Sequence, residues 1–182
     1  MLDLTETVIS SKHIYHGRVI DVRVDTVKLP DGNEAARDIV AHYGAIAAVP
    51  MLDDGQIVLV RQYRLPALST LLEIPAGSLN KDEEYDACVY RELAEEIQYT
   101  AGRIRKLFSM FVAPGYSTEQ IHVYLAQDLS PKTAKGDDDE FLQIETATID
   151  EALAKIDSGE IRDAKSIAGI LYVARIRDSG NL

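Results

Sequence analysis

The stretch Arg91-Glu92-Leu93-Ala94-Glu95-Glu96 decides how this sequence is interpreted. Apolar residues recur at helical spacing from residue 87 to residue 97, which predicts one amphipathic helix. Residues three and four positions apart are neighbours on a helix surface. The three glutamates of the stretch therefore lie on one short arc, where their negative charges repel one another.

A hard divalent cation removes this repulsion. Mg²⁺ prefers oxygen ligands and binds through a few carboxylates together with waters and substrate phosphates. The stretch therefore indicates metal-assisted chemistry on a phosphorylated substrate.

Composition excludes several other classes of protein. The 182 residues suit one domain, or one domain with a small appendage, and 46% hydrophobic with 27% charged residues is ordinary for a soluble protein. The net charge of −11 argues against a nucleic-acid partner, which needs a basic surface. The N-terminus lacks the features of a signal peptide, no apolar run is as long as a membrane span, and Cys88 is the one cysteine. We expect a cytoplasmic protein without membrane association.

The first half of the chain predicts mainly strands. Residues 5–42 spread valines among polar residues around a turn at 29–33, which predicts a small antiparallel sheet. Two short apolar runs, 45–50 and 57–60, predict a buried hairpin closed at 53–55. A turn is expected at 75–77.

The second half of the chain alternates helices with strands. Asn80, followed three residues later by Glu83, resembles a capping box at the start of the helix that carries the glutamates. Strands are expected at 104–112, 120–127 and 141–147, and helices at 149–157 and 163–177. Strands flanked by helices predict an α/β sandwich.

The helix and the residues before it carry a known signature. Gly77, then five residues to Glu83, then seven to Arg91-Glu92-Leu93-Ala94-Glu95-Glu96, resembles the Nudix box of hydrolases that act on nucleoside diphosphates linked to another group. Gln98 stands where the family usually has glycine, at the end of the helix. Glycine there would serve a left-handed turn, which glutamine adopts at a cost of roughly 1 kcal/mol.

The rest of the chain is similar to ADP-ribose pyrophosphatases within that family. The matching segments are residues 61–64 and 72–77, the loop 114–119 that begins with Pro114, the acidic loop 137–140 and the C-terminal segment 159–165. The resemblance implies a Nudix-type α/β/α sandwich with a mixed sheet, at residues 43–182, preceded by the small antiparallel sheet at residues 1–42. In such relatives the N-terminal sheet is exchanged across a homodimer.

The same resemblance implies roles for individual residues. The metal ligands would be Glu92, Glu95, Glu96 and the backbone carbonyl of Ala76, which the turn leaves free. The general base would be Glu140, with Asp138 as the alternative, and Glu95 also counts among the catalytic residues. Substrate would contact Arg37, Arg64, Glu119 and Tyr15. Gly77, Glu83, Arg91 and Pro114 would support the site.

These roles imply a Mg²⁺-dependent hydrolase, with Mn²⁺ as an alternative metal, that cleaves ADP-ribose to AMP and ribose 5-phosphate. Two alternatives stay open. The substrate could be a nucleotide sugar, NADH or a diadenosine polyphosphate, or the protein could be a catalytically silent sensor that binds a nucleotide. The full set of glutamates argues against the sensor, because binding alone does not require it.

Overall fold

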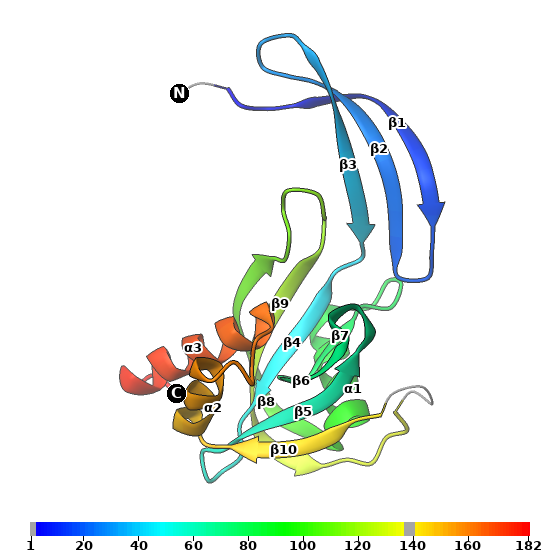
Figure 1. The fold of residues 1–182 in the computed structure, drawn as a ribbon. Helices are drawn as coiled ribbons and strands as arrows, with labels where there is room; N and C mark the ends of the chain where they lie inside the picture. Colours follow the sequence, from blue (N-terminus) through cyan, green and yellow to red (C-terminus); the bar gives the residue numbers. More distant parts are fainter. Residues whose placement is uncertain (1–2, 137–140) are drawn as a thin grey trace. The chain divides into compact units, whose positions relative to one another are not determined.

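The computed structural model describes residues 3–136 and 141–182, and the chain divides into two compact units (Figure 1). The first unit comprises Met1–Gly44 with Phe111–Gln120, and the second comprises Ala45–Met110 with Ile121–Leu182. Within the described residues, no helix is long and apolar enough to cross a membrane.

The first unit is built on a three-stranded antiparallel sheet, which confirms the predicted N-terminal sheet. Its order is β1 (Thr7–His16), β2 (Ile20–Lys28) and β3 (Glu34–His42). Every residue of β1 is exposed, and among described residues 3–44 Val27 is the one buried hydrophobic side chain. This sheet therefore encloses almost no core of its own.

The second unit contains two further sheets and the helices. One sheet has the antiparallel order β10-β5-β6, and the other has the order β7-β4-β9-β8, in which β4 is parallel to β9 and antiparallel to β7. Its strands are β4 (Ala45–Pro50), β5 (Ile57–Arg64), β6 (Ser69–Glu73), β7 (Ala76–Ser78), β8 (Tyr99–Phe111), β9 (Gln120–Pro131) and β10 (Gln143–Ala147). Its helices are α1 (Tyr85–Ile97), α2 (Ile149–Asp157) and α3 (Ala164–Asp178), with a short 3₁₀ helix at Leu65–Ala67.

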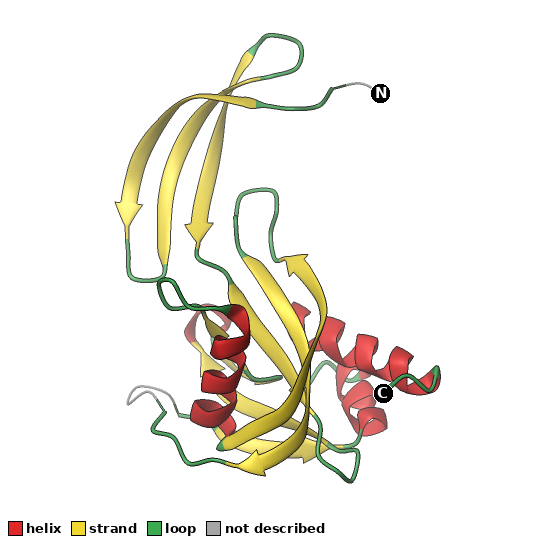
Figure 2. Cartoon of the chain, turned by 180° about the vertical axis from the view of Figure 1, so that it is seen from behind, coloured by secondary structure: helices red, strands yellow, loops and turns green. Residues whose placement is uncertain are grey.

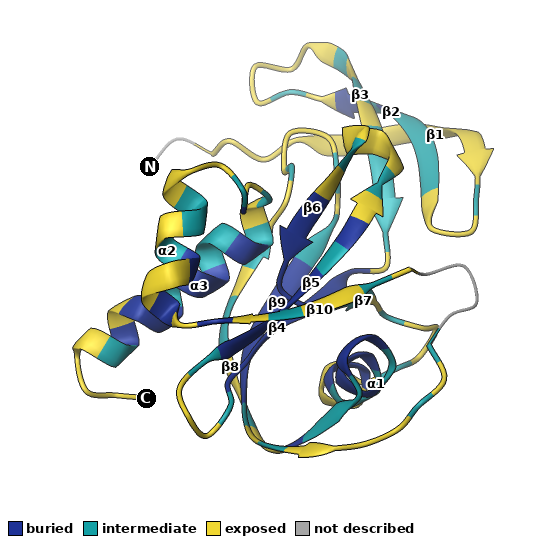
Figure 3. Ribbon diagram, turned by 60° about the horizontal axis from the view of Figure 1, so that its bottom comes forward, coloured by how far each residue is buried: buried dark blue, intermediate teal, exposed yellow. Residues whose placement is uncertain are grey.

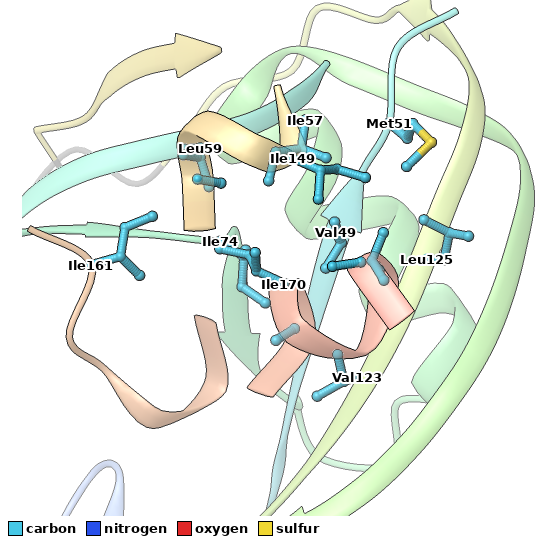
Figure 4. Close-up of a cluster of buried hydrophobic side chains, with 14 of the residues drawn as sticks. Val49, Met51, Ile57, Leu59, Ile74, Val123, Leu125, Ile149, Ile161 and Ile170 are labelled. Atoms are coloured by element: carbon cyan, nitrogen blue, oxygen red, sulfur yellow. The ribbon is translucent and has the colours of Figure 1, made fainter. Parts of the chain in front are cut away.

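The central strands are buried on both faces, which places a separate core on each side. In β4, Ile46 and Ala48 pack in the cluster that includes α1 residues, whereas Ala47 and Val49 pack in the cluster that includes α3 residues. Figure 2 shows α1 on one side of these strands and α2 and α3 on the other. Figure 3 shows that β4 is buried along its length, as is the first half of β5. Figure 4 shows the core on the α3 side. The mixed α/β sandwich is confirmed.

Three local predictions were wrong. The runs 45–50 and 57–60 do not pair as a hairpin. Each run is apolar on both faces and lies between other strands, β4 between β7 and β9, and β5 between β10 and β6. Only an isolated bridge, between Met51 and Ile57, joins the two segments. The turn expected at 75–77 lies largely in strand β7, which pairs with β4. Asn80 does not cap α1, which begins five residues later.

Candidate active site

Helix α1 presents the glutamates because its opposite face is fixed in the core. Cys88, Val89, Leu93 and Ile97 are all buried in the cluster on the α1 side of the strands. The helix ends at Gln98, whose backbone is left-handed, with φ 60° and ψ 35°, and whose N–H donates to the carbonyl of Leu93. The expected left-handed turn is therefore present with glutamine in it.

The side chain of Gln98 also contacts the chain that follows β9. Its Nε2 donates to the carbonyl oxygens of Ala94 at 3.2 Å and Ala134 at 2.9 Å. The backbone N–H of Ala134 donates in return to Oε1 at 3.4 Å. Glutamine thus adds contacts at the end of α1 that glycine could not make.

Arg91 is the centre of the acidic cluster. It donates to both carboxylate oxygens of Glu83 at 2.8 and 2.9 Å, and its Nη1 donates to Glu92 at 2.6 Å and Glu95 at 3.0 Å. Its Nη2 also reaches the carbonyl oxygen of Ser78 at 3.1 Å. One guanidinium thereby joins the loop before α1, strand β7 and the helix itself.

Charge in this cluster shifts two pKa values. The hydrogen bonds from Arg91 lower the pKa of Glu83 to about 2, so that this carboxylate is ionised at neutral pH. The hydrogen bond to Glu83, together with the negative charge of Glu92, raises the pKa of Arg91 despite partial burial. Arg91 and Glu83 are therefore held as a permanent ion pair beside the other glutamates.

Gly77 and Ala76 bring strand β7 against two of the glutamates. A Cβ at residue 77 would lie 1.8 Å from Oε1 of Glu92, so only glycine leaves room for that carboxylate. The backbone N–H of Ala76 donates to Oε2 of Glu96 at 3.0 Å. Glu92 and Glu96 are buried, whereas Glu95 is partly exposed.

The ligand type of this cluster fits a hard divalent cation. In the described part of the chain, no group of three His, Cys, Asp or Glu side chains is arranged to hold a metal ion as it stands. Arg91 donates to one oxygen of Glu92 and to one oxygen of Glu95. A carboxylate can keep such a hydrogen bond while it binds a cation through its other oxygen. All the candidate ligand atoms are oxygens, which a hard divalent cation prefers. Because residue 77 is glycine, the carboxylate of Glu92 occupies space that a side chain would otherwise fill.

Arg64, at the end of β5, is held by a buried carboxylate. Its Nε and Nη2 donate to the two oxygens of Glu73 at 3.1 and 2.8 Å. Lys165 of α3 donates to the same carboxylate at 2.6 Å. Glu73 received no role from the sequence, although a single acid within the apolar run Leu71-Leu72-Glu73-Ile74 was a signal that could have identified it.

Four expected site residues lie in the first unit. Arg37 of β3 donates to both oxygens of Glu6, and Tyr15 of β1 is exposed. Pro114 is exposed, and Glu119 is partly exposed, with its backbone N–H donating to Oγ of Ser117 at 3.1 Å. The two candidate bases, Glu140 and Asp138, lie outside the described residues.

Comparisons with known proteins cover nearly the whole chain. Residues 41–169 match the model of the NUDIX domain, and residues 6–40 match the nucleoside diphosphate sugar hydrolase N-terminal domain. The chain is 41% identical over 175 residues to an ADP-ribose pyrophosphatase of Bacillus subtilis (strain 168), covering 95% of each chain. It is 40% identical over 170 residues to a methanol dehydrogenase activator of Bacillus methanolicus, covering 92% of each.

A solved structure described as an ADP compounds hydrolase shares the fold. It superposes with a TM-score of 0.87 at 20% identity and covers 99% of both chains. The family-model match spans most of the chain and includes the helix with the acidic cluster and the glycine against which Glu92 packs. The chain belongs to the Nudix hydrolase family.

Proposed function

We propose that this protein is a Mg²⁺-dependent pyrophosphohydrolase that cleaves ADP-ribose to AMP and ribose 5-phosphate. The observation that carries the proposal is the Arg91 cluster, in which β7, the loop before α1 and the helix converge on glutamates of the Nudix box. The similarity to an ADP-ribose pyrophosphatase over 95% of the chain supports the choice of substrate.

The metal site in this proposal consists of Glu92, Glu95, Glu96 and the carbonyl of Ala76. Mg²⁺, or Mn²⁺ in its place, would neutralise diphosphate charge and lower the pKa of a bound water. Arg91 and Glu83 would keep the glutamates in position, because outer partners orient the residues that bind a metal.

Hydrolysis breaks one P–O bond of the diphosphate and adds the oxygen of water to phosphorus. Glu140 is the proposed base that accepts the water proton, with Asp138 as the second choice; both assignments come from the family resemblance. The proton then passes to the departing phosphate. Glu95, whose carboxylate accepts from Arg91 at 3.0 Å, is proposed both as a metal ligand and as a catalytic residue.

Four residues are proposed to contact the substrate. Arg37 and Arg64 would bind diphosphate oxygens, which suit the planar fork of a guanidinium. Glu119 would accept hydrogen bonds from ribose hydroxyls, and Tyr15 would stack on adenine. Pro114 would shape the loop that contains Glu119.

We further propose that residues 1–42 form the dimerisation subdomain of a homodimer and that residues 43–182 form the hydrolase domain. The support is the apolar character of an exposed strand, since Val8, Ile9, Ile14 and Tyr15 of β1 are each more than half exposed. Apolar side chains gathered on one exposed strand are typical of an interface. Sedimentation at low protein concentration tests this, and a monomer would contradict it.

A nucleoside diphosphate sugar is the second candidate substrate. The match of residues 6–40 to the N-terminal domain of nucleoside diphosphate sugar hydrolases favours it. The chemistry and the metal site would be the same, and the group attached to the diphosphate would differ.

The test is a substrate panel. Purified protein is incubated with Mg²⁺ and, in parallel, with ADP-ribose, a nucleotide sugar, NADH and a diadenosine polyphosphate, and the products are separated by ion-exchange chromatography. We expect AMP and ribose 5-phosphate from ADP-ribose at the highest kcat/KM. A higher kcat/KM for another compound would identify that compound, and not ADP-ribose, as the preferred substrate. Binding without turnover of any of them would indicate a sensor.

A further inference from the structure

Glu73 is the most deeply buried acidic side chain in the described part of the chain. It is 1% exposed and ends strand β6, immediately before Ile74. An ionised carboxylate loses its hydration when it is buried, at a cost of several kcal/mol unless cations and hydrogen bonds replace the water. Core packing alone therefore does not explain an acid at this position.

Glu73 is surrounded by cations that keep it ionised. Oε1 accepts from Nε of Arg64 at 3.1 Å, and Oε2 accepts from Nη2 of Arg64 at 2.8 Å and from Nζ of Lys165 at 2.6 Å. Burial alone would raise the pKa of Glu73, but the hydrogen bonds and charges of Arg64 and Lys165 outweigh burial and lower it. Both carboxylate oxygens are therefore used as acceptors.

Arg64 reaches Glu73 by lying along the sheet. The register of β5 and β6 pairs Arg64 with Ser69, whereas Glu73 is paired with Val60. Alternation places all four residues on the same face of the two strands. The two charged side chains must therefore both extend along this face to meet. An exposed arginine would not hold such an extended conformation without a fixed partner, because it loses rotamer freedom.

The carboxylate is itself anchored to helix α3. Lys165 also donates to Asp163 at 2.8 Å, and Asp163 is the N-cap residue of α3, accepting from the backbone of Ser166. Oγ of Ser166 accepts from the backbone N–H of Ile74 at 2.9 Å. The first turn of α3 is thus fixed both to the Glu73 carboxylate and to the backbone of the next residue, Ile74.

From this geometry we propose that Glu73 is a positioning residue, which orients the guanidinium of Arg64 toward the diphosphate of the substrate. The inference rests on the proposed function, in which Arg64 contacts that diphosphate. Two N–H groups of Arg64 are engaged by Glu73, which fixes the plane and direction of the guanidinium, while 39% of the Arg64 side chain stays exposed. Lys165 holds Glu73 in turn.

Glu73→Gln tests the inference directly. Because both oxygens of Glu73 accept from N–H donors, the amide nitrogen of glutamine would face one of those donors and the two-pronged contact with Arg64 would be lost. We expect KM for the diphosphate substrate to rise about tenfold while kcat changes by less than about threefold, because the misplaced guanidinium binds ground state and transition state alike. An unchanged KM would overturn the inference.

A second variant separates positioning from a merely structural effect. Arg64→Ala is made alone and together with Glu73→Gln. If Glu73 acts through Arg64, the second substitution adds little to the KM of the first, whereas independent effects would multiply. Multiplying effects would overturn the inference.

The matched control lies on the same strand. Arg61 of β5 donates through Nε and Nη2 to the two oxygens of Glu145 on β10, at 2.5 and 3.3 Å, so the same kind of ion pair exists on the opposite face. Glu145→Gln is expected to leave KM unchanged. If Glu73→Gln does not fold, Arg64→Lys keeps the charge but loses the fork, and it is expected to give the same rise in KM.

The wild-type protein distinguishes the two possible failures. If it hydrolyses no member of the substrate panel, the proposed function is wrong. If it hydrolyses a diphosphate and the Glu73→Gln and Arg64→Lys proteins keep the wild-type KM for that compound, the function holds and the role of Glu73 is wrong.

Discussion

The backbone of Gly77 lies directly against the carboxylate of Glu92, where a Cβ on Gly77 would stand 1.8 Å from Oε1 and 2.0 Å from Cδ. The φ angle of Gly77 does not lie in the left-handed region, so alanine could adopt the same backbone conformation. The glycine is therefore required by the position of a side chain and not by the path of the chain.

Gly77→Ala is expected to disable the enzyme with little loss of stability. The added methyl group would push the flexible end of Glu92 out of place, and a displacement of about 1 Å at such a site costs roughly 100-fold in rate. The free energy of unfolding should change by less than about 1 kcal/mol. Steady-state kinetics and urea unfolding measure the two effects. Wild-type kinetics would show that Glu92 is not a ligand.

Glu96→Gln should separate metal binding from folding. The amide oxygen of glutamine can still accept from the backbone N–H of Ala76, as Oε2 of Glu96 does at 3.0 Å. The charge needed to bind a divalent cation is lost, so we expect kcat to fall by several orders of magnitude, on the order of 10³ or more, at saturating Mg²⁺. Near-normal turnover would refute the ligand assignment.

Acid should weaken the fold through Glu83. The pKa of this carboxylate is about 2 in the folded protein, because Arg91 donates to it, and 4.5 is its ordinary value. Between these values the unfolded chain binds more protons, so stability rises with pH. The contribution, up to roughly 3 kcal/mol, is present in full above about pH 5 and is lost as the pH falls toward 2.

Urea unfolding of metal-free protein at pH 7 and at pH 4 measures this contribution. The Glu83→Gln protein lacks the titrating group and should lose less stability than the wild type between the two pH values. Equal losses in the two proteins would mean that the Arg91 contact does not shift the pKa of Glu83.

The Gln98 position allows backbone strain and side-chain contacts to be measured separately. Gln98→Ala keeps the left-handed backbone but loses the bonds to Ala94 and Ala134, so we expect a destabilisation of about 1–2 kcal/mol. Gln98→Gly loses the same bonds but removes the strain, and it should be more stable than the alanine protein by about 1 kcal/mol. Thermal unfolding of the three proteins tests this. Equal stability of the two variants would show that residue 98 is not left-handed in solution.

The sequence predicted α1 because its signals are local. The spacing from Gly77 through Glu83 to Arg91 lies within one loop and one helix, and the structure brings these residues into contact. The α2 and α3 helices were predicted within one or two residues for the same reason, since apolar periodicity is a signal that spans only a few turns.

Strand partners and distant ion pairs were not predictable in this way. The apolar runs of β4 and β5 have no polar face. Nothing in them therefore shows whether a strand pairs with the next strand in the sequence or with a more distant one. The contact of Lys165 with Glu73 joins residues 92 positions apart. No pattern over a short window can predict such a pair, although an isolated acid in an apolar strand shows that some partner must exist.

The left-handed end of α1 has a consequence for how members of this family are identified. The fold requires a backbone conformation at residue 98, and glycine is simply the amino acid that supplies it most readily. A search pattern that insists on the letter G there would overlook this chain and any homologue in which a polar side chain has taken over the turn. Describing that position by its torsion angles would recover them.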